Sequence, residues 1–396
     1  MTLTAAQPST LLLYEPRTEG HHLAWLRLIA EDLCIAGYRL TIAADLRPGT
    51  EAKLRDHLGQ IHGQVNWLNA YDAQGRRHCG GKAESVAYCL EQSGAEYVFL
   101  CTLDEIASSC WRRAAFGLFP PASLHGRMGG IYHRPRFMAA SAWSPNRWMK
   151  EAGFRRLLRQ GWLRQLVFLD EFLARDCQAA YPGTPVFFLP DPCLERFEGD
   201  ATEARKTLEV PPDRRVFLCY GTGARRKGLH LAVEAFLQLP ADSPAFLLCV
   251  GRQQFDRQTE AGMKQLVVQG RARLINRYVS MAEEKMSFAA ADLVLLPYVG
   301  HFGISAVLSQ AMAANRPVIA SDEQLLGRLV CEHQPGLLFR SGEADSLRQA
   351  IQKALAASAD DWSRWRTAAR NYAAQHSRAA FRNALRAALA PAGDAP

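Results

Sequence analysis

The feature that most constrains the fold of this chain is the regular alternation of short apolar runs with longer segments of helical periodicity. Apolar runs occupy residues 11–14, 40–44, 97–103, 166–169 and 186–189 in the first half. In the second half they occupy residues 216–220, 245–250, 274–279, 293–298, 317–320 and 336–339. Strands buried on both faces of a parallel sheet show such continuous runs, and strand–helix alternation is typical of an open sheet covered by helices. The sequence therefore predicts an α/β protein with doubly wound parallel sheets.

The length of the chain predicts more than one domain. Its 396 residues exceed what a single hydrophobic core usually organises. Prolines at 190, 192, 211 and 212 bracket a short charged segment before the next strand begins, which places a border there. We expect a Rossmann-like domain over residues 1–200, a second over residues 201–361, and a C-terminal helix over residues 362–396 that packs back toward the first domain.

Composition narrows the class of protein. No apolar run approaches the ~18–20 residues that span a bilayer, and the first ten residues lack the basic and apolar regions of a secretion signal. We therefore expect a cytoplasmic protein. Its ten cysteines include no Cys-x-x-Cys pair, so neither a zinc ribbon nor a redox motif is predicted, and we expect no metal site.

The net charge of +8 is concentrated between Arg147 and Arg164. Such a patch could meet anionic lipid at the inner face of the plasma membrane, a phosphorylated acceptor or nucleic acid, and an ordinary solvated helix surface is the alternative. Gly153 and Gly161 are expected to interrupt any helix there. No nucleic-acid-binding motif accompanies the patch, so we expect no nucleic-acid partner.

Three strand–helix turns carry chemically suggestive residues. The first begins at Gly221 and reads Gly-Thr-Gly-Ala-Arg-Arg-Lys-Gly over residues 221–228, directly before a helix that starts near Leu229. A glycine-loosened turn at a helix N-terminus offers free backbone N–H groups to a phosphate, and Arg225, Arg226 and Lys227 add positive charge. An exposed basic turn without a role is the alternative.

The second turn follows the strand at residues 293–298. It consists of Gly300, His301, Phe302, Gly303, Ile304 and Ser305. Ser305 is predicted to cap the next helix, leaving N–H donors of its first turn for an anion, and Asn315 suits the left-handed residue that ends it.

The third turn, Glu19-Gly20-His21-His22, follows the first strand. Paired histidines suggest a metal, but no carboxylate or further histidine stands at ligand spacing, so Gly20 and His21 are interpreted as part of a ligand-facing turn. After the strands ending near 103 and 133, Asp104, Glu105 and His133 also stand at a sheet edge. They could serve a substrate, whereas helix capping for the acids and a structural role for the histidine are the alternatives.

The second half of the chain resembles the C-terminal domain of the retaining GT-B glycosyltransferases, often called glycosyltransferase family 4. The resemblance is carried by Gly221, by Lys227-Gly228 and by the Glu-Ala-Phe at 234–236. It also rests on Gln-Ala-Met-Ala-Ala-Asn-Arg-Pro-Val-Ile-Ala-Ser over residues 310–321. It covers residues 214–345 well and the first half loosely. It implies two Rossmann-like domains that face an interdomain cleft, with the acceptor on the first and the nucleotide-sugar donor on the second.

The resemblance also implies roles for particular residues. Lys227 and Arg226 would neutralise a departing diphosphate, and His133 would contact the transferred sugar. The donor would be held by Gly20, His21, Gly221, Arg225, His301, Phe302, Gly303, Ile304, Ser305 and Gln310. Retention of configuration without a metal or other cofactor is implied as well. The family carries two glutamates where this chain has Phe302 and Gln310, which puts the donor sugar and turnover in question.

These observations lead to one main hypothesis and two alternatives. The main hypothesis is transfer of a sugar from a UDP- or GDP-sugar to a cell-envelope glycan, a lipid-linked acceptor or a small molecule. The alternatives are a degenerate GT-B protein that binds nucleotide or partners without turnover, and a GT-B sugar-nucleotide epimerase. An epimerase would produce an isomerised sugar nucleotide with no acceptor present.

Overall fold

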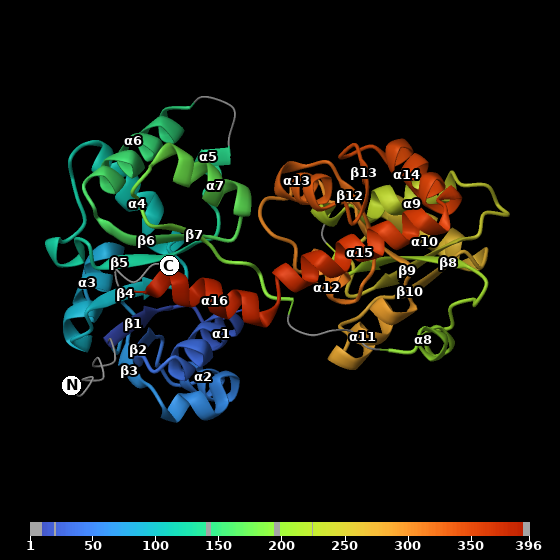
Figure 1. The fold of residues 1–396 in the computed structure, drawn as a ribbon. Helices are drawn as coiled ribbons and strands as arrows, with labels where there is room; N and C mark the ends of the chain where they lie inside the picture. The colour runs from blue at the N-terminus through green and yellow to red at the C-terminus, as the bar shows by residue number, and fades with distance from the viewer. Residues whose placement is uncertain (1–9, 20, 140–143, 194–198, 224, 391–396) are drawn as a thin grey trace, which may run out of the picture. The chain divides into compact units, whose positions relative to one another are not determined.

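The chain folds into two compact units, which are described separately. The computed structural model describes residues 10–390 except residues 20, 140–143, 194–198 and 224. Unit 1 contains Met1–Leu189 and Arg382–Pro396, and unit 2 contains Pro190–Phe381 (Figure 1). Each unit holds its own parallel sheet, so the predicted α/β class with doubly wound sheets is confirmed.

The sheet of unit 1 has seven parallel strands in the order β3-β2-β1-β4-β5-β6-β7. Their bounds are β1 Thr10–Tyr14, β2 Arg39–Ala44, β3 Asn66–Asn69, β4 Tyr97–Leu100, β5 Met128–Tyr132, β6 Leu163–Phe168 and β7 Val186–Phe188. The chain winds from β1 outward to β3 and then crosses back to β4 on the other side of β1. The switch point of this sheet therefore lies between β1 and β4, and in open α/β sheets ligands bind outside the carboxyl ends of the strands at that point.

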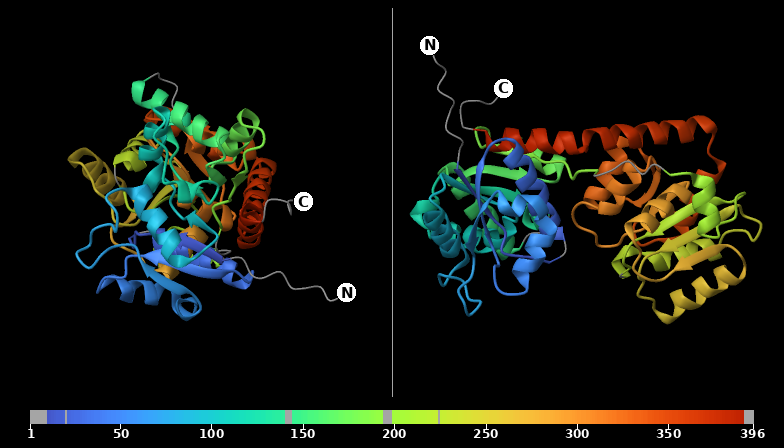
Figure 2. Two further views of the ribbon diagram at one scale, coloured as in Figure 1. Left: turned by 90° about the vertical axis from the view of Figure 1, so that its left-hand side faces the viewer. Right: turned by 90° about the horizontal axis from the view of Figure 1, so that it is seen from below.

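Helices cover both faces of this sheet, with α4 and α6 side by side on one face and α1 and α2 on the other (Figures 1 and 2). The helices are α1 His21–Ile35, α2 Thr50–Leu58, α3 Lys82–Ser93, α4 Asp104–Ala115, α5 Arg136–Ala139, α6 Pro145–Arg159 and α7 Glu171–Ala180. Between the sheet and α4 lies a continuous core that includes Leu12, Leu100, Trp111 and Leu166. Burial of such side chains contributes about 1.5–3 kcal/mol each and holds the strand ends in place.

The sheet of unit 2 has six parallel strands in the order β10-β9-β8-β11-β12-β13. Their bounds are β8 Arg215–Tyr220, β9 Ala245–Val250, β10 Ala272–Ile275, β11 Leu293–Leu296, β12 Val318–Ser321 and β13 Gly336–Phe339. The helices are α8 Ala201–Thr207, α9 Leu229–Leu237, α10 Arg257–Val268, α11 Met281–Ala290, α12 Ala306–Ala313, α13 Gln324–His333, α14 Ala344–Ala356 and α15 Ala359–Gln375. The switch point lies between β8 and β11, which are the two strands that precede the glycine-containing turns at 221–228 and 300–305.

The C-terminal segment forms two helices. The first, α15, places Trp362 and Trp365 in the core of unit 2. The second, α16 (Arg378–Leu389), begins in unit 2, and its residues from Arg382 onward belong to unit 1. There Arg382 pairs with the buried Asp32 at 2.9 Å, and Tyr38 donates a hydrogen bond of 3.1 Å to the carbonyl of Leu389.

One prediction about helix breaking is wrong and has a packing explanation. Gly153 lies inside α6, which continues through it to Arg159. A Cβ atom at Gly153 would stand 1.7 Å from the carbonyl oxygen of Trp111, so the missing side chain lets α6 lie directly against α4. Gly161 does follow the end of α6, with a φ of 68°. Among the described residues no helix is long and apolar enough to cross a membrane.

Candidate functional site

The turn after β8 is shaped by close backbone approaches that exclude side chains. Gly228 has a φ of 69°, and a Cβ atom there would lie 1.5 Å from the carbonyl oxygen of Pro297, just beyond β11. On the other side, a Cβ atom at Gly251 would lie 2.4 Å from the carbonyl oxygen of Gly221. The glycine-containing turn is thus pressed between the carboxyl ends of β11 and β9, where its backbone can approach a ligand.

The structure brings two of the sequence-predicted turns together at this edge. The amide of Val299 donates a 2.8 Å hydrogen bond to the carbonyl of Arg226, which fixes the first turn on the second. The Nζ atom of Lys227 lies 3.9 Å from the centre of the Tyr298 ring. An Nη atom of Arg226 lies 3.4 Å from Nδ1 of His301. Arg226, Lys227 and His301 therefore form one cluster at the switch point of unit 2, as the sequence predicted for neighbouring strand ends.

Arg225 does not join this cluster. Its guanidinium pairs with Asp256 at 3.1 Å and its side chain is 79% exposed. Asp256 also caps α10 by accepting a hydrogen bond from the amide of Thr259. This pairing directs Arg225 toward the start of α10.

The cationic cluster is held without a neutralising carboxylate. No acidic side chain in the described part of the chain forms an ion pair with Arg226 or Lys227. Burial, assisted by the nearby charge of Arg226, lowers the pKa of Lys227 to about 8. Burial and the charges of Lys227 and Arg226 lower the pKa of His301 to about 4, so this imidazole is neutral at pH 7. A bound anion would favour the charged forms of both groups and so oppose the combined effect of burial and repulsion on their pKa values.

The start of α12 lies at the same carboxyl edge of the sheet as the cationic cluster. Ser305 caps the helix as predicted, because its Oγ accepts a 3.3 Å hydrogen bond from the amide of Leu308. The same hydroxyl donates to the Tyr298 hydroxyl at 3.2 Å, which connects the cap to the ring under Lys227. Gly303 adopts a φ of 93°, which only glycine accepts readily, and Phe302 and Ile304 are half-buried beside it. Asn315 ends the helix region with a φ of 55°, also as predicted.

Gln310 on α12 makes a contact that the sequence did not predict. Its side-chain amide donates a short hydrogen bond to the carboxylate of Glu284 on α11. The Oε1 atom of Gln310 is buried and has no hydrogen-bond partner among the described residues. A carboxylate is therefore present next to the position where the related glycosyltransferases carry one, although it comes from a different helix.

The carboxyl edge of unit 1 contains a second group of polar side chains. Glu15, directly after β1, is 1% exposed, and its carboxylate accepts hydrogen bonds from Thr102 Oγ1 at 2.7 Å and the Arg17 amide at 3.1 Å. The His22 ring lies 3.2 Å from the same carboxylate.

His133 is fixed beside that group. Its Nε2 lies 2.9 Å from the carbonyl of Cys101, and its ring meets Trp25 edge-on at 5.8 Å. Burial lowers the pKa of His133 below its ordinary value. Asp104 accepts hydrogen bonds from the backbone amides of His133 and Arg134, so it anchors the end of β5 and caps no helix. Gly20 lies outside the described residues, and of His21 only the backbone, at the start of α1, is described.

Among the described residues no group of three or more histidine, cysteine or acidic side chains is arranged to hold a metal ion.

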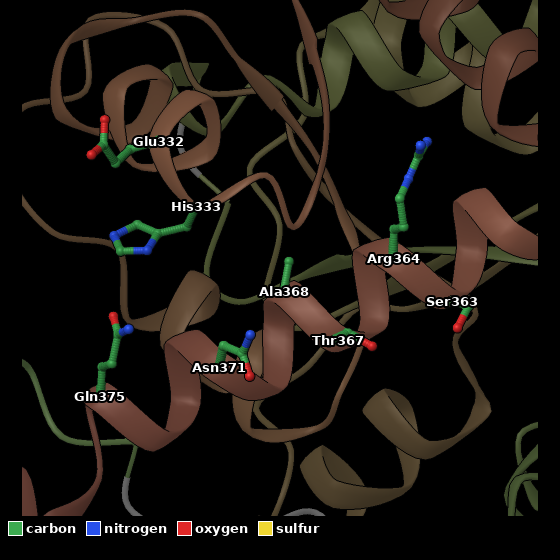
Figure 3. Close-up of a pocket in the computed structure, with 8 residues that line it drawn as sticks. All are labelled: Glu332, His333, Ser363, Arg364, Thr367, Ala368, Asn371 and Gln375. Carbon is green, nitrogen blue, oxygen red and sulfur yellow. The ribbon is translucent and has the colours of Figure 1, made fainter.

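A separate groove of about 460 Å³ lies between the end of α13 and one face of α15 (Figure 3). Its lining includes Glu332 and His333 from α13, and Arg364 and Asn371 from α15. Because α13 leads into β13, this groove is next to the amino end of that strand, at the sheet edge opposite to the cationic cluster. Arg364, the arginine in this lining, pairs with Asp361 on the same helix, so the groove lacks the unpaired positive charge of the carboxyl edge.

Two parallel doubly wound sheets, one with a cationic glycine turn at its switch point, define a protein of the GT-B fold. Residues 200–372 match the family Glycosyl transferases group 1. Among curated relatives, TuaC of Bacillus subtilis, named as a teichuronic acid biosynthesis glycosyltransferase, is 30% identical over 163 residues, which cover 40% of this chain and 39% of TuaC. The chain spans between 39% and 53% of the length of the curated relatives that it matches.

Solved structures support the fold over nearly the whole chain. A glycosyltransferase from Rickettsia africae superposes with a TM-score of 0.66 at 13% identity, covering 95% of this chain and 96% of that one. HepE of Anabaena, solved in complex with UDP, superposes with a TM-score of 0.64 at 17% identity and covers 95% of this chain and 97% of HepE.

Proposed function

We propose that the chain transfers a sugar from a UDP- or GDP-sugar to an acceptor of the cell envelope, either a glycan or a lipid-linked intermediate, or to a small molecule. The observation that carries this proposal is the unneutralised pair Arg226 and Lys227 at the switch point of unit 2. The family match of residues 200–372 and the UDP bound by the structurally similar HepE support the same ligand class.

The geometry suggests what these groups would do in the reaction. The bond between the sugar's anomeric carbon and the diphosphate oxygen breaks, and a bond to an acceptor oxygen forms as that oxygen passes its proton to the departing diphosphate. Negative charge grows on the departing nucleoside diphosphate, so cations fixed beside it stabilise the transition state more than the ground state. The amides of Gly221, Gly223 and Gly228 already donate to backbone carbonyls of unit 2. Other amides of the turn after β8 and the first turn of α12 would hold the phosphates, with residues 301–304 around them.

Retention and metal independence belong to this proposal. The two cations would take the place of the divalent ion that other transferases use to neutralise the diphosphate, so EDTA should leave the rate unchanged. Transfer would place the acceptor on the face of the sugar that the diphosphate leaves. A product with inverted configuration would contradict retention, and a rate that depends on Mg²⁺ or Mn²⁺ would contradict metal independence. Either result would leave the proposed transferase activity in place.

His133 and Gln310 are assigned roles within the same proposal. His133, neutral because of its burial, would contact the transferred sugar by hydrogen bonding. Gln310 and Glu284 together would hold the ribose hydroxyls that a glutamate holds in related enzymes. A second function, nucleotide binding without turnover, is favoured by the same site, because Phe302 supplies no carboxylate near the sugar.

Peripheral membrane contact is proposed for the surface formed by α4, α6 and the turn between α4 and β5. Phe116, Leu118 and Trp148 are 68%, 57% and 56% exposed on it. Arg156 lies over the Phe119 ring at 5.4 Å, so cationic and apolar groups share this surface. Co-sedimentation should be stronger with phosphatidylglycerol vesicles than with phosphatidylcholine vesicles, and it should fall in Trp148→Ser and Arg156→Glu. Absence of binding to phosphatidylglycerol vesicles would exclude the contact, and equal binding to both vesicles would exclude the role of its cationic groups.

The transferase proposal is tested by following release of nucleoside diphosphate from a panel of UDP- and GDP-sugars with envelope extracts as acceptor. Lys227→Ala should lower turnover by about two orders of magnitude, as expected for losing one contact to a developing anion. The control is Lys264→Ala, which removes an equal charge from an exposed pair with Glu260 on α10. Saturable UDP or GDP binding with no release from any donor would favour the non-catalytic alternative instead.

A further inference from the structure

The carboxyl edge of unit 1 has an electrostatic feature that the proposed function does not use. Glu105, at the start of α4, is buried, and its side chain is only 4% exposed. Three cations contact this one carboxylate: Arg17 at 2.6 Å, Lys82 at 3.2 Å and Arg77 at a shorter distance. A buried carboxylate requires compensation, but one or two cations provide it, so the third is in excess.

The neighbouring acids do not absorb this excess. Asp45 is paired with Arg47, and Glu15 is occupied by the Arg17 amide, Thr102 and His22. Although burial opposes it, the charges of Lys82, Arg17 and Arg77 hold the pKa of Glu105 below its ordinary value, so the carboxylate stays ionised. Glu15 accepts its hydrogen bonds from an amide and a hydroxyl, so its negative charge offsets one cation. Arg17, Arg77 and Lys82 against Glu105 and Glu15 still leave one positive charge in surplus.

The cations differ in how freely they can reach a ligand. Arg77 is 22% exposed and is also tied to the Tyr14 hydroxyl at 3.2 Å and the Tyr71 ring at 5.8 Å, so it is a structural member of the group. Arg17 and Lys82 are 51% and 47% exposed, and Glu105 is the carboxylate that each of them contacts among the described residues. Both can therefore keep one donor on Glu105 and turn another outward.

The position of the group indicates a binding role. Arg17 follows β1 and Glu105 follows β4, which are the two strands that flank the switch point of this sheet. Outside the carboxyl ends of strands at such a point, open α/β sheets bind their ligands. Charge-assisted hydrogen bonds from Arg and Lys suit carboxylate and phosphate groups.

We propose that unit 1 selects an acceptor bearing a phosphate or carboxylate group, which Arg17 and Lys82 bind at the carboxyl edge of β1 and β4. That the bound molecule is an acceptor rests on the proposed transferase function. The anion site itself is inferred from the charges and the geometry of unit 1. A neutral sugar would leave the surplus charge unmatched and would bind more weakly.

The site is tested with three small probes, inorganic phosphate, glucuronate and glucose, titrated by calorimetry at constant ionic strength. The titrations use the chain saturated with UDP or GDP, so that the cationic cluster of unit 2 is occupied. They are repeated without nucleotide in Lys227→Ala, where Arg226 remains in that cluster, and the anion affinity that Arg17→Ala/Lys82→Ala removes in this background is assigned to unit 1. Binding of phosphate with little response to glucuronate assigns a phosphate acceptor, and the reverse assigns a uronate acceptor. The double variant Arg17→Ala/Lys82→Ala should bind the preferred anion at least about tenfold more weakly.

Two controls separate a ligand site from a structural cluster. Arg55→Ala, which removes an exposed cation paired with Glu51 on α2, should leave anion affinity unchanged. Glu105→Gln frees three mutually repelling cations, so phosphate should raise the melting temperature of this variant more than that of the parent chain. If the three probes bind equally weakly, or if the double variant retains full anion affinity, the inference is overturned.

The outcome is distinguishable from failure of the proposed function. Absence of UDP and GDP binding with intact phosphate or glucuronate binding in the Lys227→Ala chain would refute the transferase proposal and keep the anion site. Nucleotide binding without any anion binding at unit 1 would refute the anion site and leave the transferase proposal standing.

Discussion

Lys227 should take up a proton when a nucleoside diphosphate binds. Burial and the neighbouring Arg226 lower the pKa of Lys227 to about 8 in the chain without ligand. A diphosphate in contact with the ammonium would favour the charged form and return the pKa toward its usual value of about 10.4. Without ligand, Lys227 is therefore partly deprotonated at and above pH 8. Binding of the diphosphate under these conditions must draw a proton from the buffer.

The size of this uptake follows from the pKa. With a pKa of about 8 before binding and about 10 after it, uptake should be roughly 0.1 proton per nucleotide at pH 7, about 0.5 at pH 8 and about 0.8 at pH 9. His301, with a pKa of about 4, is neutral over this range and contributes little. A full return to the usual pKa corresponds to at most about 3 kcal/mol of coupling between the lysine charge and the ligand.

Calorimetry in pairs of buffers with different ionisation enthalpies measures this uptake directly. Lys227→Met should abolish the uptake and weaken UDP or GDP binding by about one to two orders of magnitude. Lys264→Met, at the exposed pair with Glu260, should change neither quantity. Tight nucleotide binding with no proton uptake at pH 8, or with equal uptake in Lys227→Met, would refute the placement of the diphosphate beside Lys227.

Three further predictions concern stability. Burial raises the pKa of Asp191, which accepts a hydrogen bond from Ser309, to about 6. The pKa of an aspartate in the unfolded chain is about 3.9, so ionisation of Asp191 destabilises the native state as the pH rises from 4 to 6. Asp191→Asn should therefore raise the free energy of unfolding by about 2 kcal/mol at pH 7 and leave it unchanged at pH 4, as measured by urea denaturation. Gln310→Glu should place two carboxylates in contact and cost about 1–3 kcal/mol at pH 7. That cost should disappear below the unfolded pKa of about 4.3, and adding Glu284→Gln should restore stability at pH 7. Gly228→Ala should destabilise unit 2 by about 3 kcal/mol or more, because its Cβ would meet Pro297, whereas Gly270→Ala, with a φ of 66° and open space around it, should cost only about 1–2 kcal/mol. Equal losses in the two glycine variants would contradict the close-approach argument.

The strands that line the sites could be predicted from sequence because each is buried on both faces. β9 and β13 begin and end where the apolar runs do, β8 begins one residue before its run, and α9 begins at Leu229 as the glycine turn predicted. The edge strand β3 was missed, because Asn66–Asn69 is half-exposed and carries no apolar run. Local signals also sufficed for the Ser305 cap and the left-handed Asn315, since both depend on neighbouring residues.

Contacts between distant segments could not be predicted from one sequence. The pairing of Gln310 with Glu284 depends on how α12 lies against α11. The cluster on Glu105 brings together Arg17 from after β1 and Lys82 from the start of α3, and nothing in their spacing indicates it. The role of Gly153 likewise follows from the packing of α4 against α6, whereas helix propensity alone favoured a break.

The central claim is that a nucleoside diphosphate binds at the carboxyl edge of β8 and β11. Hydrogen–deuterium exchange with and without saturating UDP or GDP tests it most directly, because bound phosphates protect the amides that hold them. The account predicts slower exchange in residues 221–230 and 299–310, with the groove between α13 and α15 unchanged. Protection confined to that groove, or to unit 1, with no change in 221–230, would contradict it.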